Sequence, residues 1–127
     1  MWIMVAGPYA SGATDATARA ANLAALNAAA LAVWRKGHVP VIGVNMALPV
    51  IAAAGDEAAY AKIMLPMSLA LAERCDACLR VGGPSAGADA EVARFRALGR
   101  PVYGGIDAIP TVGGLRPAGL EPATKPL

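Results

Sequence analysis

Short apolar runs alternate along the chain with longer segments whose apolar side chains recur every three or four residues. The runs lie at about residues 2–6, 39–44, 77–81 and 101–103. The first is apolar throughout, which is typical of a parallel strand covered on both faces. Strands that alternate with helices predict an α/β fold. We therefore expect a single flavodoxin- or Rossmann-like domain, with a parallel sheet of four to five strands flanked by helices.

The segments between the runs predict three helices, at about residues 15–36, 57–74 and 86–98. Each follows a residue type that commonly caps helices: Thr14 or Asp15, Asp56, and Ser85. Pro66 lies inside the second helix and is expected to kink or split it, because proline cannot donate the main-chain hydrogen bond. Residues 45–56 are expected to be irregular.

The composition indicates a domain boundary and suits a homo-oligomer. Hydrophobic residues make up 57% of the 127 residues, and many of them are alanine. Alanine-rich helices can approach one another closely, which suits a homo-oligomer. The composition changes after Ile109, and residues 110–127 contain four prolines and three glycines. We expect a domain over residues 1–109 and a tail over 110–127, either disordered or lying over the body or a neighbour.

Several classes of protein are not expected. The net charge of +2 comes from scattered basic residues, so no nucleic-acid partner is expected. The apolar stretch over residues 39–54 is interrupted and too short for a bilayer, and no basic leader precedes the first strand, so we expect a cytoplasmic protein without membrane contact. Cys75, Cys78 and His38 are too few for a zinc site, so we expect buried reduced thiols, a structural histidine, and no metal or cofactor.

The segment "VGGPSAGADAE", residues 81–91, is where we expect the chemistry. Loops that follow parallel strands meet at one edge of the sheet, so residues 7–12 and 82–87 are expected to line one crevice. Ser85 as helix cap would turn main-chain N–H groups toward that crevice, where they suit an anion. Glu91, one turn after Gly87, would lean back over a position without a side chain. The simpler interpretation is a helix cap and an acidic residue favoured by the helix dipole.

The other residues narrow the chemistry. His38 is expected at the opposite edge of the sheet from Ser85, so a Ser-His-Asp arrangement is not expected. The first loop lacks the lysine of a phosphate-binding P-loop. A carboxylate next to polar groups fits cleavage of a bond to a sugar anomeric carbon, where it traps or stabilises an oxocarbenium-like centre.

Three segments resemble the nucleoside 2-deoxyribosyltransferase superfamily, in particular its small uncharacterised branch related to nucleoside 5′-monophosphate N-glycosidases. They are "IMVAGPY" at residues 3–9, "RAANLAALNAAALAVWRKGHVPVIG" at residues 19–43 and "CDACLRVGGPSAGADAE" at residues 75–91. The resemblance covers about residues 2–109, and the third segment is the most specific of the three.

The resemblance implies roles for several residues. Glu91 would be the nucleophile or the group that stabilises the sugar centre, and Ser85 and Gly87 would hold a phosphate or a sugar hydroxyl. The other side of the pocket would be lined by the first loop: Gly7, Pro8 and Tyr9. It also implies a small-molecule nucleoside or nucleotide as partner, and a homo-oligomer, dimer or tetramer, whose pockets are completed by a neighbour.

The chain departs from the family pattern at two places. The helper aspartate before the third strand is replaced by Met67, with Ser68 beside it. The arginine of the first loop in nucleotide hydrolases is replaced by Ala10 and Ser11. Arg19 is a candidate substitute, although it can also pair with Asp15 one turn earlier.

Three further polar residues are candidates for substrate contact. They are Asn22, which continues the stripe of Arg19; Asn45, just past the second strand; and Asp89, which the helix dipole also favours. Our first hypothesis is an N-glycosidase or deoxyribosyltransferase-like enzyme with Glu91 as the reactive carboxylate. The alternatives are a non-catalytic nucleotide- or metabolite-binding module, and a relative of the fold without a small-molecule role.

Overall fold

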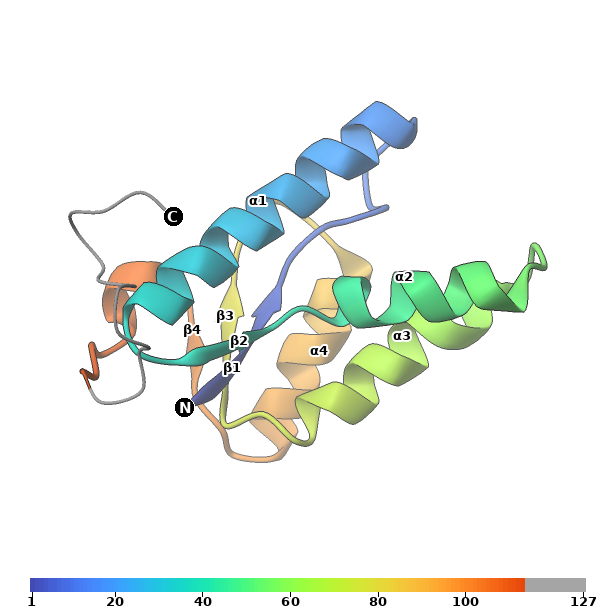
Figure 1. Ribbon diagram of the computed structural model, residues 1–127. Helices are drawn as coiled ribbons and strands as arrows, with labels where there is room; N and C mark the ends of the chain where they lie inside the picture. The colour runs from blue at the N-terminus through green and yellow to red at the C-terminus, as the bar shows by residue number, and fades with distance from the viewer. Residues whose placement is uncertain (114–127) are drawn as a thin grey trace.

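The computed structural model describes residues 1–113, and it shows an α/β fold built on a parallel sheet (Figure 1). In this part of the chain the sheet has four strands in the order β2-β1-β3-β4, all of them parallel. The strands are β1 (Trp2–Ala6), β2 (Val39–Val41), β3 (Ala77–Arg80) and β4 (Val102–Tyr103). The fold class expected from the sequence is therefore confirmed. Residues 114–127 of the predicted tail lie outside the described residues.

Four α-helices and one short 3-10 helix accompany the sheet in residues 1–113. They are α1 (Ala16–Arg35), α2 (Gly43–Ala54), α3 (Ala59–Ala72), α4 (Ala86–Ala97) and η1 (Ile106–Ala108). Asp15 caps α1 by accepting a hydrogen bond from the Ala18 N–H at 2.8 Å. Among these helices, none is both long enough and apolar enough to cross a bilayer.

The structure corrects the expectation that residues 45–56 are irregular, because α2 occupies most of them. Pro49 lies inside this helix and cannot donate a bond to the Asn45 carbonyl. Both residues are exposed, so water can satisfy that carbonyl, while the buried Ala47 side holds the helix against the body. Gly55 ends the helix with a left-handed φ of 71°.

Pro66 does not split its helix, which also corrects an expectation. α3 is continuous from Ala59 to Ala72 with Pro66 inside it. Pro66 and Lys62, whose carbonyl loses its partner, are both exposed. Hydration of that carbonyl and packing of the opposite side of α3 against α2 and α4 outweigh the missing bond.

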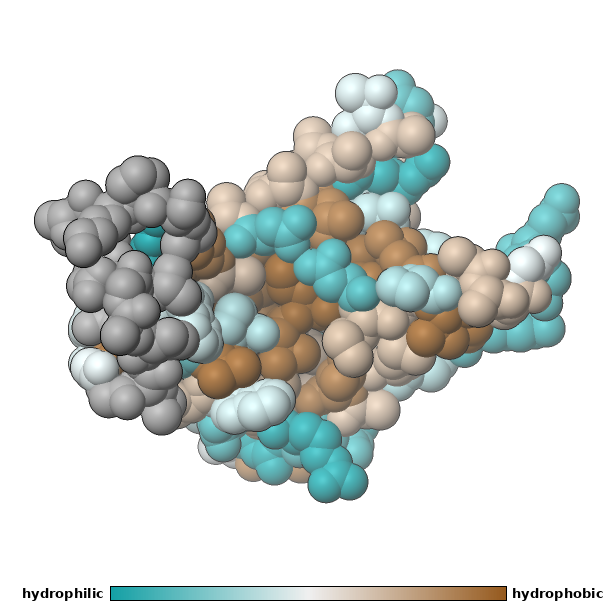
Figure 2. All heavy atoms as spheres, viewed as in Figure 1, coloured by the Kyte–Doolittle hydropathy of each residue, from teal (hydrophilic) through white to brown (hydrophobic). Residues whose placement is uncertain are grey.

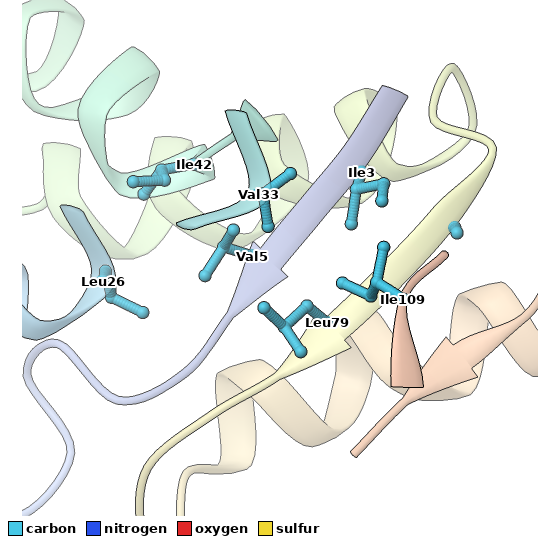
Figure 3. Close-up of a cluster of buried hydrophobic side chains, with 8 residues drawn as sticks. Ile3, Val5, Leu26, Val33, Ile42, Leu79 and Ile109 are labelled. Carbon is cyan, nitrogen blue, oxygen red and sulfur yellow. The ribbon is translucent and has the colours of Figure 1, made fainter. Parts of the chain in front are cut away.

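Two hydrophobic layers cover the two faces of the sheet. Ile3 and Val5 of β1 point to the layer formed with α1, which supplies Leu26 and Val33 (Figure 3). The alternate residues of β1 point to the other layer, formed with α3 and α4. That layer contains the residues Met4, Ala6, Ala72, Cys75, Cys78, Ala88, Val92 and Phe95. The two central strands, β1 and β3, are thus covered on both faces, which explains their apolar sequences.

The segment after β4 is held against the end of α1. Lys36 donates from Nζ to the carbonyls of Ile106 and Ile109, both at 2.8 Å. His38, which is 1% exposed, receives a bond from the terminal ammonium at Nδ1 and donates from Nε2 to the Pro110 carbonyl. The start of the predicted tail therefore lies on the body, at the end of the sheet where β2 begins.

Gly37 allows the segment that contains Val112 to pass close to the end of α1. A Cβ on Gly37 would lie 1.7 Å from the Val112 carbonyl oxygen, and the φ of Gly37 is 92°. Replacing Gly37 with Ala is expected to lower the free energy of unfolding by more than Gly55→Ala does. Gly55 also has a positive φ, but a Cβ there meets nothing within 4 Å, so only the cost of the left-handed backbone, about 1–2 kcal/mol, applies. Chemical denaturation of both variants measures the difference, and equal losses would contradict the proposed contact.

Candidate functional site

A cavity of about 250 Å³ opens at the carboxyl ends of β1 and β3. The chain leaves β1 for β2 on one side and reaches β3 on the other, so the cavity lies at the switch point of the strand order. The loop after β1 and the start of α4 both line it, as the sequence analysis expected. The lining residues are Gly7, Tyr9, Ala10, Ser11, Val44, Tyr60, Ala61, Met64, Leu65, Ser68, Ser85, Gly87, Ala88 and Glu91.

The start of α4 is fixed by Ser85, which is the helix cap that the sequence indicated. Its backbone is extended, with a φ of −160°, and its Oγ accepts a bond from the Ala88 N–H at 3.2 Å. Ser11 of the first loop donates from its hydroxyl to the same Oγ at 3.3 Å. The two serines therefore join the two loops at the cavity wall.

Gly87 and Glu91 lie one turn apart on α4 and both line the cavity. A Cβ built on Gly87 meets nothing within 4 Å, so the space beside this position is open. The side chain of a helical residue leans toward the helix N-terminus. Glu91 is thereby directed toward the open space over Gly87.

Glu91 is buried without a hydrogen-bonding partner. Its exposed fraction is 8%, and it accepts no hydrogen bond from residues 1–113. Burial raises the pKa of this carboxyl from 4.5 to about 7, although the positive charge of Arg80 acts in the opposite direction. The carboxylate oxygens are open to the cavity, but burial of the rest of the group still disfavours its charged form. Such a group is typical of functional sites, where the ligand supplies the missing contacts.

Arg80, at the end of β3, is a residue that the sequence analysis did not single out. Its guanidinium donates to the carbonyls of Val81 and Gly83, and it forms an ion pair of 3.6 Å with Asp89. The Asp89 side chain is 73% exposed and does not line the cavity. The structure thus gives Asp89 a contact with Arg80 and no direct contact with the cavity.

α3 forms a third wall of the cavity, which the sequence analysis did not predict. Tyr60, Met64 and Ser68 line the cavity at intervals of four residues, whereas Met67 does not. Ser68 is 5% exposed, and its hydroxyl makes no hydrogen bond within residues 1–113. A Cβ on Gly43 would lie 2.1 Å from the Ser68 Oγ, so the glycine leaves room for this hydroxyl. In the sequence, the four-residue spacing of Tyr60, Met64 and Ser68 indicates that these side chains share one side of the helix.

The first loop contributes to the cavity unevenly. Gly7 and Tyr9 line it, while Pro8 lies outside the lining and against Gly82. Asn22 lies behind the loop and donates to the Tyr9 carbonyl at 2.7 Å. Asn22 therefore holds the loop in place instead of lining the cavity.

Arg19 and Asn45 also lie outside the cavity lining. Burial and the neighbouring Tyr9 raise the pKa of the Tyr60 phenol. The positive charge of Arg19 acts in the opposite direction, so Arg19 lies near Tyr60. Asn45 donates to the Asn27 side chain at 2.8 Å beside a second cavity at the outer edge of β2. The surface there, between α1 and α2, is largely apolar (Figure 2).

The other side chains that could react or bind a metal ion lie outside the cavity lining. Cys75 and Cys78 are free and buried, and burial raises their pKa values to about 11 and about 12. Such thiols are protonated at neutral pH and are weak nucleophiles. No group of three or more His, Cys, Asp or Glu residues in positions 1–113 is arranged to hold a metal ion.

Comparison with protein-family models finds no match to this chain, and comparison with curated proteins finds none.

The raised pKa of Glu91 makes the stability of the protein depend on pH. From pH 4.5 to about 7 the unfolded chain releases a proton that the folded chain keeps, so the free energy of unfolding falls as pH rises and levels off above about 7. Glu91→Gln removes this loss, and its advantage over the native protein is expected to grow by roughly 3 kcal/mol across the interval. Denaturation at several pH values measures it, with the exposed Glu57→Gln as control. A constant difference would contradict the buried carboxyl.

Proposed function

We propose that the protein is a cytoplasmic N-glycosidase or deoxyribosyltransferase-like enzyme that cleaves the N-glycosidic bond of a nucleoside or nucleoside 5′-monophosphate. The observation that carries the proposal is the Glu91 carboxylate, which is buried, accepts no hydrogen bond from residues 1–113 and lies beside the open space over Gly87. The resemblance in residues 75–91 supports the same role for this residue.

The reaction begins with ionised Glu91 close to the anomeric carbon of the sugar. The bond from that carbon to the base nitrogen breaks, and its electron pair leaves with the base, which takes a proton from water. One carboxylate oxygen forms a bond to the anomeric carbon, or stabilises its positive charge. Water or a second base then attacks the same carbon and releases the carboxylate. A pKa of about 7 makes the reactive ionised form more abundant as pH rises through that value.

The walls of the cavity suit the two halves of a nucleoside. Tyr9, Tyr60 and Met64 offer aromatic and apolar surface against which a base can stack. Ser85, Ser11 and the first main-chain N–H groups of α4 offer polar contacts for the sugar. Tyr60 and Leu65 are each 37% exposed at the rim, where a second subunit of a dimer or tetramer would cover them.

The alternative function is a module that binds a nucleoside, nucleotide or related metabolite without turnover. Glu91 is the only carboxylate among the residues that line the cavity in the described part of the chain, so no second acid faces a leaving base. Met67 stands where the family has its helper aspartate, and Met67 does not reach the cavity. This observation favours binding without chemistry.

Glu91→Gln separates the two functions. For an enzyme, base release from a nucleoside or 5′-monophosphate is expected to fall about 100-fold or more, because the amide can neither attack nor balance positive charge, while ligand binding is retained. Chromatography of released base and calorimetry measure the two effects. Glu57→Gln is the control, since Glu57 is exposed and lies outside the cavity. Unchanged base release in the Glu91 variant would exclude Glu91 as the reactive group.

Gly87→Ala tests whether the open space is the substrate site. The added methyl group meets no protein atom within 4 Å, and alanine favours a helix over glycine by up to about 1 kcal/mol, so stability is not expected to fall. The methyl group occupies substrate space, and kcat/KM is expected to drop about 10-fold or more. Gly83→Ala is the matched control, because it also meets nothing and lies outside the lining. Full activity of the Gly87 variant would place the substrate elsewhere.

A further inference from the structure

We propose that the cavity takes an uncharged nucleoside in preference to its 5′-monophosphate, because among residues 1–113 its only charged lining group is acidic and its other polar side chains are neutral. This inference rests on the proposed function and narrows its substrate class.

The charges around the cavity carry the proposal. Among the lining residues of the described chain, Glu91 supplies a carboxylate, and none is a lysine, arginine or histidine. A phosphate carries about two negative charges near neutral pH. Placed in this small cavity it would repel the Glu91 carboxylate, and burial strengthens that repulsion. No cationic side chain in the lining offsets it.

Two arginines have charges that act on lining residues, Arg80 on Glu91 and Arg19 on Tyr60, but neither serves as a phosphate ligand in this arrangement. The Arg80 guanidinium is used by the carbonyls of Val81 and Gly83 and by the ion pair with Asp89, and Arg80 lies outside the lining. Arg19 also lies outside the lining, and its charge acts on Tyr60 of α3. Within residues 1–113, the cavity lining therefore has no side chain that matches the bidentate geometry of a phosphate.

The neutral polar groups match sugar hydroxyls instead. Ser68 is 5% exposed, lines the cavity and makes no hydrogen bond within residues 1–113. This hydroxyl is open to the cavity, where a substrate hydroxyl can both donate to it and accept from it. Gly43 leaves the space that this hydroxyl occupies. The Ser85 Oγ accepts from Ala88 and Ser11, so its O–H is left to donate to one sugar oxygen.

The size and protonation of the site agree with a small uncharged ligand. The cavity volume of about 250 Å³ lies just below the range of about 300–1,000 Å³ that drug-sized ligands occupy. The pKa of Glu91 is already raised to about 7 by burial. A second anion beside it would raise that pKa further and protonate the carboxylate that the reaction needs.

The experiment compares matched pairs of nucleosides and their 5′-monophosphates at pH 8, in both base-release and calorimetric binding assays. We expect kcat/KM, or affinity where no base is released, to be at least about 10-fold higher for the nucleosides. Ser68→Ala is expected to weaken nucleoside binding without lowering the unfolding midpoint, because the hydroxyl makes no hydrogen bond within residues 1–113. Ala10→Lys places a cation at an exposed position of the lining and is expected to raise the relative kcat/KM or affinity for the monophosphates, with exposed Ala20→Lys on α1 as the control for net charge.

The outcomes separate this inference from the proposed function. Faster cleavage of the monophosphates, or a loss of monophosphate turnover on Arg19→Gln with nucleoside turnover unchanged, would overturn the inference and leave the glycosidase function standing. Tighter nucleoside binding without base release would support the inference and replace the enzyme with the binding module. Failure of every nucleoside and monophosphate to bind would overturn both.

Discussion

The arrangement of the site depends on one unfavourable interaction, the burial of the Glu91 carboxyl without a hydrogen-bonding partner. Gly87, Ala88 and Val92 beside it on α4 are apolar or lack a side chain, and Arg80 offsets the cost of burial only in part. The helix tolerates this cost because Val92 and Phe95 anchor its other positions in the core under the sheet. The carboxyl is thereby held beside an open space with its contacts unfilled, which is what a group that reacts with a ligand requires.

The parallel sheet brings the other residues of the site next to this carboxyl. The strand order β2-β1-β3-β4 brings the loops after β1 and β3 together at one end of the sheet. The Ser11–Ser85 hydrogen bond joins residues 74 positions apart in the sequence at that point. The opposite end has a different role, since Lys36, His38 and the terminal ammonium hold the segment after β4 there. The polar contacts that hold the segment after β4 therefore lie at the other end of the sheet from the unpartnered acid.

α3 illustrates how tertiary packing changes the meaning of a sequence pattern. The sequence predicted a helix at about residues 57–74, which Pro66 was expected to kink or split. In the structure the helix runs without interruption between α2 and α4, and the positions of Tyr60 and Ser68 become a wall of the cavity. The residue next to the expected helper position, Ser68 instead of Met67, reaches the site because the rotation of the helix is set by its packing against both neighbours.

Sequence alone determined the features that depend on local physics. Continuous apolar runs indicated a parallel sheet with two covered faces, Asp15 and Ser85 indicated helix starts, and the spacing of Gly87 and Glu91 placed both on one side of α4. Only the tertiary structure decided which polar residues surround that acid, because these contacts join distant elements. It assigned Asn22 to the first loop, Asn45 to Asn27 and Asp89 to Arg80, and it added Ser68. It also decided that residues 45–56 are helical, since the packing of α2 against α3 outweighs the cost of an internal proline.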